Sequence, residues 1–229
     1  MLPLEFVYID QVHPDIRFDI RYFSKLNFTG EIIDGYCVNR SIMTKAAANA
    51  IAKVQEIVAK NGLDLVIYDS YRPIKAVEHF FRWSQSASDD SNVKENFYPH
   101  IQKSNAFELG YIGRQSSHSR GSTIDLSLIE KSSALKAHKD ITPSKRLLPD
   151  GRIIHFLDDG TLDMGSHFDL FDKASWHQDS IFSGEYLERR TFLRKIMMEN
   201  GFDDYRKEWW HYCLIDEPFP DKRFDFDVI

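Results

Sequence analysis

Cysteine is scarce in this sequence, since its 229 residues include only Cys37 and Cys213. Two cysteines so far apart form neither a disulfide framework nor a CxxC metal site, and they favour a reducing compartment. The sequence has no run of about eighteen apolar residues, which excludes a transmembrane helix and so a membrane partner. The opening residues lack a basic and apolar leader, so we expect a cytoplasmic protein, or a periplasmic one if a signal peptide has been removed.

Basic residues are not in excess either. The chain has 29 lysines and arginines against 35 aspartates and glutamates, which gives a formal net charge of -6. This balance argues against a nucleic-acid partner, because nucleic-acid binding usually needs a basic face. The sequence shows no internal repeat and no low-complexity linker, and its length suits one large domain. We therefore expect a single domain over residues 1–229. The oligomeric state stays open, and a homodimer is one possibility.

The apolar residues predict helices and strands in a mixed order, without a regular βαβ alternation. Thr44 is expected to cap the first helix, Pro73 to be the first residue of the second, and Gly201 to end the third. Helices are predicted over 44–62, 73–87 and 184–201, and strands over 63–69, 122–128 and 208–215. This pattern predicts an α+β fold with a mainly antiparallel sheet flanked by helices.

The region from 130 to 163 is less regular. Its stretch LLPDGRIIHFLDDGTL, residues 147–162, has two Asp-Gly turn signals around an apolar run. Asp-Gly pairs between apolar stretches are typical of tight β-turns, so a hairpin is predicted over 147–162.

The stretch SSHSRGSTID, residues 116–125, places His118 on a polar turn and Asp125 inside a predicted strand. Alternation puts Asp125 on one face of that strand together with Thr123 and Ser127. A buried carboxylate without a partner costs several kcal/mol or becomes neutral. Asp125 therefore requires compensation by a cation, which would be an arginine or a metal.

A second histidine, His211 in the stretch EWWHY, would complete a metal site. Together His118, Asp125 and His211 offer two imidazoles and one carboxylate, a three-ligand set for zinc that leaves a fourth position for water. Glu208 precedes His211 by three residues. If the chain bends there and the strand proper begins near Trp209, Glu208 would stand beside the metal as general base.

Two purely structural interpretations of these residues remain open. Each histidine would also fit a hydrogen-bonded pair with an aspartate and no metal. The EWWHY stretch would also fit an aromatic core strand with a glutamate at its edge. The sequence has no HExxH helix, so the strongest metallopeptidase signal is missing.

Arg72, in the stretch SYRP, follows a predicted buried strand and precedes a predicted helix. One interpretation is an ion pair with Asp69. The other is an oxyanion clamp, which would stabilise negative charge that appears only in the transition state.

Taken together, SSHSRGSTID and EWWHY resemble the VanX-type D-alanyl-D-alanine dipeptidases. These are zinc peptidases that share a fold with bacterial D-Ala-D-Ala carboxypeptidases and the hedgehog signalling domain. Further stretches resemble the family in the same order and cover nearly the whole chain: NFTGEIIDGYCVNR, YDSYRP, MGSHFD, NGFDDYRKEWWHY and the ending DEPFP…FDF. The resemblance implies a zinc enzyme that hydrolyses a small dipeptide, D-Ala-D-Ala.

The resemblance also implies a role for each matching residue. His118, Asp125 and His211 would bind one zinc ion, and Glu208 would act as general base and acid. Arg72 would polarise the scissile carbonyl group and hold the oxyanion. The remaining matches would contact the substrate, Asp169 and Tyr22 at its amino end and Ser116 at its far end. For Asp169, in FDLFD, a helix cap is the structural alternative.

One departure from the family concerns residues 130–163, which look longer than usual. The segment would be a surface hairpin or a lid that reshapes the pocket, and it leaves the substrate range open. His155 and His167 lie in or near it. We interpret both as non-ligands, because three protein ligands already leave the open position that catalysis needs.

Two rival functions remain. One is a D,D-carboxypeptidase that uses the same chemistry on longer peptidoglycan stem peptides. The other is a hedgehog-like binding module whose zinc site does not turn over. Glu208 and Arg72 argue against the binding module, because a site that only binds has no use for a base and an oxyanion clamp beside the metal.

Overall fold

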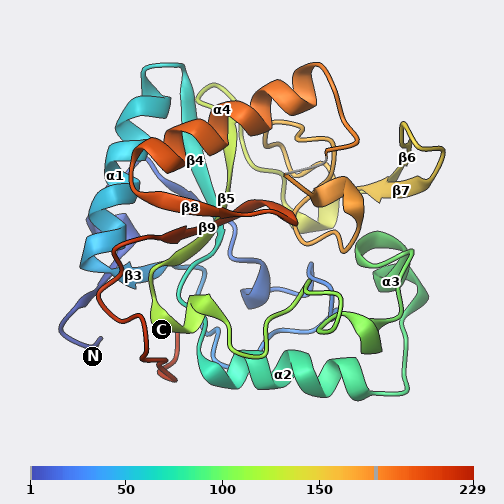
Figure 1. The fold of residues 1–229 in the computed structure, drawn as a ribbon, viewed down its shortest axis with the longest axis horizontal. Coiled ribbons are helices and arrows are strands. Elements are labelled where there is room, and N and C mark those ends of the chain that lie inside the picture. Colours follow the sequence, from blue (N-terminus) through green and yellow to red (C-terminus); the bar gives the residue numbers. More distant parts are fainter. Residues whose placement is uncertain (1, 178–179) are drawn as a thin grey trace.

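A five-stranded sheet lies at the centre of the protein (Figure 1). The computed structural model describes residues 2–177 and 180–229. The strand order is β2-β4-β5-β9-β8, and all neighbours are antiparallel except β2 and β4. The strands span Arg17–Phe18 (β2), Leu63–Asp69 (β4), Thr123–Glu130 (β5), Phe202–Tyr205 (β8) and Glu208–Leu214 (β9). The prediction of an α+β fold with a mainly antiparallel sheet is confirmed.

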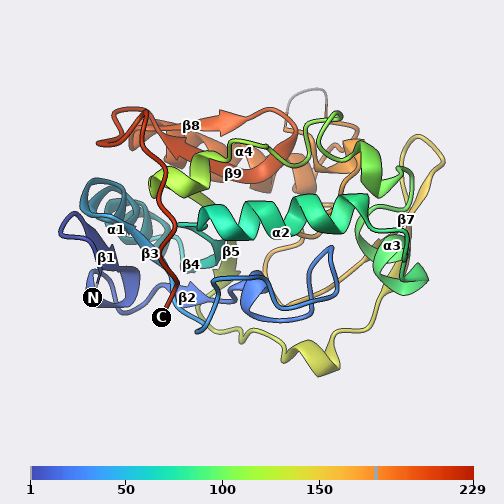
Figure 2. The same ribbon diagram turned by 90° about the horizontal axis from the view of Figure 1, so that it is seen from below.

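The described part of the chain has four α-helices. They span Lys45–Ala59 (α1), Ile74–Gln85 (α2), Ser91–Phe97 (α3) and Glu185–Glu199 (α4). Helix α1 contacts β4 and α4, and α4 also contacts β8 and β9. Helix α3 contacts β7 (Ile153–Phe156), a strand of a peripheral hairpin. Helix α2 runs along the opposite side of the molecule from α4 (Figures 1 and 2). No helix among the described residues is long and apolar enough to span a bilayer.

Helix α1 forms where the sequence predicts it. The Thr44 hydroxyl accepts a hydrogen bond from the backbone N–H of Ala47 at 3.4 Å, which satisfies one of the free donors of the first turn. Ala47, Ile51, Val54 and Val58 recur at helical spacing and are all buried against the core. The cap and the apolar face together fix this helix against the sheet.

The prediction for Pro73 is wrong by one residue. Pro73 has φ -64° and ψ 155°, which is extended, so it precedes α2 and the helix begins at Ile74. Before Pro73, the backbone N–H of Tyr71 is bonded to Ile42 O at 3.0 Å. The N–H of Ile74 is bonded to Phe224 O at 3.1 Å, so the C-terminal segment satisfies the first donor of the helix.

A hairpin forms within the predicted region, but its extent differs from the prediction. Strands β6 (Ser144–Leu147) and β7 (Ile153–Phe156) are antiparallel and lie at the periphery, away from the central sheet (Figure 1). The first Asp-Gly pair makes the turn, since Gly151 has φ +85° and its N–H bonds Leu148 O. The second Asp-Gly dipeptide, Asp159–Gly160, lies beyond the end of β7. Its Asp159 forms an ion pair with Arg21.

The remaining elements are short. Strands β1 (Phe6–Tyr8) and β3 (Ile42–Thr44) form a small antiparallel pair. Turns of 3-10 helix occur at Ile9–Gln11, Arg21–Phe23, Lys103–Asn105, Ser117–Arg120, His138–Asp140 and Lys173–Ser175. Cys37 and Cys213 are free cysteines.

Candidate metal and catalytic site

A cleft of about 510 Å³ opens beside β5 and β9. Phe28, Phe80 and Tyr111 give it an apolar part. All the residues that the sequence predicted for the site are among those that line it: Tyr22, Arg72, Ser116, His118, Asp125, Asp169, Glu208 and His211. Residues distant in the sequence thus meet in one place, at the end of the sheet.

The three predicted metal ligands converge. The β5–β9 register places Asp125 opposite His211, and His118 lies in the turn that leads into β5. The Nε2 atom of His118 lies 3.3 Å from Asp125 Oδ2, and Nδ1 of His211 lies 3.0 Å from Asp125 Oδ1. One ligand atom from each residue falls within 4.8 Å of the others.

The chemistry of these donors fits a divalent cation. The Nδ1–H of His118 donates to the carbonyl oxygen of Ser70 at 2.7 Å, so its Nε2 lone pair faces the site. Nδ1 of His211 lies only 3.3 Å from that Nε2. The buried Oδ1 of Asp125 accepts no well-aligned hydrogen bond among the described residues, although Nδ1 of His211 lies 3.0 Å away. A cation would satisfy all three atoms at once, and Arg72, whose Nη2 lies 3.5 Å from Asp125 Oδ2, is a further positive charge beside this carboxylate.

Charges around Asp125 control its protonation. Burial alone would raise the pKa of Asp125, but His118 and His211 outweigh burial and hold the pKa well below its usual range. Burial lowers the pKa of His211 despite the nearby carboxylate. Both effects favour an ionised carboxylate beside a neutral imidazole, which are the forms that bind metal ions.

Glu208 lies beside this cluster. Its Oε2 atom is 3.5 Å from Nδ1 of His211, although a regular strand would place residues three apart on opposite faces. The pairing of β8 with β9 is irregular between Asp204 and Tyr205, and Tyr205 faces Glu208. The strand pairing is thus irregular where the sequence predicts a bend, although β9 begins at Glu208 rather than near Trp209. Burial, with Asp125 and Asp169 adding to it, raises the pKa of Glu208 well above its usual value.

Arg72 is both an ion-pair partner and a residue of the cleft. Its Nε–H donates to Oδ2 of Asp69 at 2.8 Å, which confirms the ion pair that the sequence left open. The Nη2 atom of Arg72 also lies 3.5 Å from Asp125 Oδ2. Only 7% of Arg72 is exposed, so its charge acts in a largely water-free setting.

Tyr22 and Asp169 face each other in the cleft. The Tyr22 hydroxyl donates to Oδ2 of Asp169 at 2.9 Å, and both residues are buried. Burial and the nearby Asp125 raise the pKa of Asp169 to about 8. The alternative of a helix cap is wrong for Asp169, because Asp172 is the residue that caps the following turn, accepting from Ala174 N at 2.8 Å.

Ser116 caps the turn that carries His118. Its hydroxyl accepts a hydrogen bond from the backbone N–H of His118 at 3.3 Å, and the residue is 7% exposed. Ser116 thus contributes to the position of His118 as well as to the cleft wall.

The two histidines interpreted as non-ligands lie outside the residues that line the cleft. The Nδ1 atom of His155 bonds Asn96 Oδ1 at 2.7 Å. His167 is buried with its ring 5.5 Å from that of Phe97, and burial lowers its pKa to about 3. His167 is therefore neutral at ordinary pH.

Sequence reasoning missed two contacts that support the site. Asp69, considered only as a partner for Arg72, also lies 3.4 Å from Nδ1 of His118. Its other oxygen accepts a hydrogen bond from the Tyr36 hydroxyl at 2.6 Å. The place of Asp69 at the end of a predicted buried strand was an available signal, whereas its pairing with Asp125 across a register shift is seen only in the structure. Tyr36 lies in the stretch NFTGEIIDGYCVNR, which resembles the family but to which no role in the site was assigned.

Comparison with known proteins agrees with this geometry. The family model Peptidase_M15, described as D-ala-D-ala dipeptidase, matches residues 3–137 and 153–229. A D-alanyl-D-alanine dipeptidase from Enterococcus faecalis is 41% identical over 224 residues, which cover 97% of this chain and 98% of that protein. Proteins of the same name from Enterococcus faecium and Streptomyces coelicolor are 37% and 36% identical, covering 99% and 98% of this chain and 100% and 98% of their own lengths.

Proposed function

We propose that this chain, which belongs to the Peptidase_M15 family of D-Ala-D-Ala dipeptidases, hydrolyses D-alanyl-D-alanine to two molecules of D-alanine. It is then a hydrolase that acts on a small dipeptide. The observation that carries the proposal is the convergence of the His118, Asp125 and His211 donor atoms within 4.8 Å, beside the buried carboxyl group of Glu208.

The metal that we propose is one zinc ion per chain, held by His118, Asp125 and His211. Two imidazoles and one carboxylate form a donor set that zinc uses in catalytic sites, where a fourth position stays open. When bound, zinc would act as a Lewis acid on the substrate carbonyl and lower the pKa of a coordinated water from about 15.7 to roughly 7.

Glu208 moves the protons in this proposal. Its carboxylate takes a proton from the water that attacks the scissile carbonyl carbon, and returns it to the nitrogen of the leaving D-alanine. Burial favours the protonated form of Glu208, which suits the second of these steps. The 3.5 Å approach of Oε2 to His211 supports a position next to the reacting atoms.

Arg72 stabilises the charge that develops on the carbonyl oxygen. Its guanidinium is anchored on Asp69, so a fixed donor faces the cleft before the reaction begins and little reorganisation is needed. Asp169 accepts the substrate ammonium group, with Tyr22 holding the carboxylate in place, and Ser116 contacts the carboxylate end. A D,D-carboxypeptidase, whose longer substrate has no ammonium group beside the scissile bond, would have no use for the buried Asp169.

Release of free D-alanine from D-Ala-D-Ala, with and without a chelator, tests the proposal. We expect release that stops on chelation and returns on addition of Zn²⁺. Activity that survives complete removal of metal would contradict the zinc mechanism, and no release from metal-loaded protein would contradict the function. We also propose a reducing compartment such as the cytoplasm, which the free thiols of Cys37 and Cys213 support.

A further inference from the structure

The segment from His138 to Asp163 contains the stretch 138–152 that falls outside the family match. The structure describes all of it, and no residue between 130 and 163 lines the cleft. The segment is therefore not a lid over the site in this conformation. Its contacts are made instead with residues that lie near, in the chain, two residues of the cleft wall, Tyr22 and Asp169.

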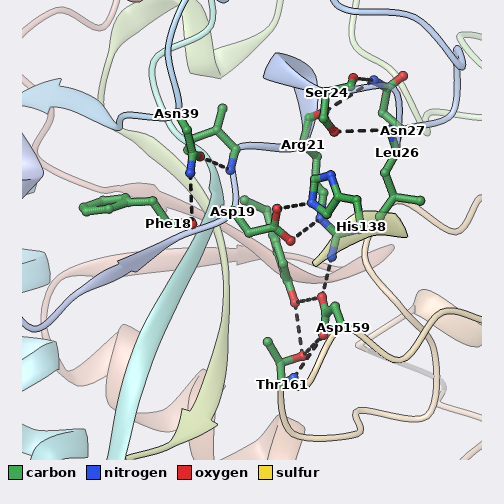
Figure 3. A network of polar contacts seen from close by, with 12 residues as sticks. Phe18, Asp19, Arg21, Ser24, Leu26, Asn27, Asn39, His138, Asp159 and Thr161 are labelled. Carbon is green, nitrogen blue, oxygen red and sulfur yellow. Dashed lines mark hydrogen bonds and ion pairs between the residues drawn. The ribbon is translucent and has the colours of Figure 1, made fainter. Parts of the chain in front are cut away.

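The first group of contacts surrounds Arg21, the residue directly before Tyr22 in the chain (Figure 3). Arg21, which is fully buried and directly precedes Tyr22, donates from Nε to Oδ2 of Asp19 at 2.7 Å and from Nη2 to Oδ2 of Asp159. The Nε2 atom of His138 pairs with the other oxygen of Asp19. The segment thus holds Arg21 from both of its ends, through His138 and through Asp159.

The second group of contacts lies around Asp169. Arg146, on β6, makes a bidentate pair with Asp163 at 2.8 and 2.6 Å, and Nη1 also donates to Gly165 O at 2.8 Å. Arg152, at the end of the hairpin turn, pairs with Asp172. These pairs tie the hairpin to the chain on both sides of Asp169.

Apolar packing reinforces the second group. Leu148 and Ile154 of the hairpin form one buried cluster with Leu170, the residue directly after Asp169. Asp169 has φ +62°, and it is the only residue other than glycine with positive φ in the described part of the chain. A backbone in this region costs about 1–3 kcal/mol and persists only where the surrounding structure fixes it. The hairpin supplies part of that restraint.

We propose that the segment 138–163 acts as a brace that positions Tyr22 and Asp169 as a pair, and so determines the preference for substrates with a free amino group. The inference rests on the proposed function, because it concerns how that substrate is recognised. His138 and Arg146 are positioning residues in this scheme. Neither lines the cleft, so they would act only through Arg21 and through the Asp163–Asp172 stretch.

The test uses two variants with matched controls. Arg146→Ala removes the bidentate pair, and Lys145→Ala is its control, because Lys145 is an exposed neighbour on β6 with no ion pair among the described residues. His138→Ala removes the contact with Asp19, and the exposed Lys139 of the same turn supplies the control Lys139→Ala. Each full-length, zinc-loaded protein is assayed for kcat and KM on D-Ala-D-Ala and on N-acetyl-D-Ala-D-Ala.

We expect the ratio of kcat/KM for the free dipeptide over the acetylated one to fall about tenfold in Arg146→Ala, the lower end of what a hydrogen bond to a charged group contributes. The loss should appear as a higher KM for the free dipeptide with kcat and zinc content unchanged. His138→Ala should shift the ratio in the same direction, Arg146→Lys should recover part of it, and both lysine controls should match the parent.

Three results would overturn the brace. The first is a ratio of kcat/KM for the free over the acetylated dipeptide that stays at the parental value in both variants. The second is an equal loss of kcat/KM on both substrates, which would indicate a general loss of structure. The third is thermal unfolding of both variants below assay temperature, since a segment needed for folding is not a substrate-specific brace. Failure of the parent to hydrolyse D-Ala-D-Ala would instead contradict the proposed function itself.

Discussion

Asp69 anchors Arg72: the Arg72 Nε–H donates to Asp69 Oδ2 at 2.8 Å, and both side chains are almost fully buried. The Tyr36 hydroxyl occupies the other oxygen of Asp69 at 2.6 Å. The ion pair and the oxyanion clamp, which looked like alternatives in the sequence, are therefore compatible. A guanidinium fixed along one edge is a preorganised donor, and preorganisation gives charge stabilisation its value in a dry cleft.

Replacement of Arg72 tests this arrangement. Arg72→Lys keeps a cation near Asp69 but loses the planar fork, so we expect kcat to fall by about 10²–10³, the loss typical of one oxyanion donor. Zinc content, measured by metal analysis of the purified variant, should stay at the parental level. An effect confined to KM would show instead that Arg72 binds the ground state of the substrate.

Glu208→Gln should keep zinc and lose activity. The amide has nearly the same shape as the carboxyl group but cannot accept and return a proton, and general acid–base groups contribute about 10²–10⁴-fold. Turnover of D-Ala-D-Ala and zinc content are measured on the same preparation. If the variant loses its zinc together with its activity, Glu208 is a ligand and the assignment of roles is wrong.

The metal ligands can be separated from the other histidines of the protein. His118→Ala should lose most of its zinc, because two remaining donors hold a metal poorly, and the activity should disappear with the metal. His155→Ala is the matched control, since His155 bonds Asn96 outside the cleft and should leave zinc content unchanged. Parental zinc content in His118→Ala would remove that residue from the ligand set.

Asp19 predicts how stability depends on pH. Burial alone would raise the pKa of Asp19, but Arg21 and His138 outweigh burial and lower the pKa to about 2. A carboxyl group whose pKa is depressed in the folded protein stabilises the fold at pH values above its unfolded pKa. For Asp19 this contribution is about 2 kcal/mol, at 1.36 kcal/mol for each pKa unit of the shift. It is lost as the pH falls from about 4 through 2.

The measurement is urea unfolding of the parent and of Asp19→Asn from pH 7 to pH 3. The difference in free energy of unfolding between the two proteins should shrink as the pH falls below 4. Asp10→Asn removes an exposed pair with Arg40 and serves as the control, with little effect expected at any pH. A difference that does not change with pH would show that Asp19 acts by packing rather than by charge.

Much of the fold was predictable because the decisive signals are local. The alternation of Ile124 and Leu126 around Asp125, and the spacing of Ile51 and Val54 in α1, indicate strand and helix without any knowledge of distant contacts. The exact bounds of the elements were less predictable. The hairpin begins at Ser144 rather than at 147 because β6 pairs through a polar stretch that carries no apolar alternation.

The supporting contacts of the site were not predictable, because they join residues that are far apart in sequence. Arg21 meets Asp159 across 138 positions, and no local pattern marks either residue as a partner. Tyr22 and Asp169, 147 positions apart, were paired only through the family resemblance. Short motifs specify the chemistry at a site, whereas its support depends on tertiary packing that one sequence does not reveal.

The Tyr22–Asp169 pair yields the prediction that separates a dipeptidase from a carboxypeptidase. A free dipeptide carries an ammonium group beside the scissile bond, whereas a longer stem peptide carries an amide. Acetylation of the substrate amine removes the charge that would keep the buried carboxyl group of Asp169 ionised, because the pKa of that group is raised to about 8. Breaking such an ion pair costs about 2–5 kcal/mol, so the parent should have a kcat/KM for N-acetyl-D-Ala-D-Ala that is lower by roughly 30-fold or more.

Asp169→Asn should erase much of that preference. Asparagine suits the test because it tolerates the positive φ of this position, so charge is removed without added backbone strain. Tyr22→Phe removes only the 2.9 Å hydrogen bond to Asp169 and should weaken the preference less. The kcat/KM values of both substrates are compared in the parent and both variants at one zinc concentration.

Equal rates on both substrates in the parent would favour the carboxypeptidase and take Asp169 out of substrate recognition. A strong parental preference that survives in Asp169→Asn would assign the ammonium group to another carboxylate of the cleft.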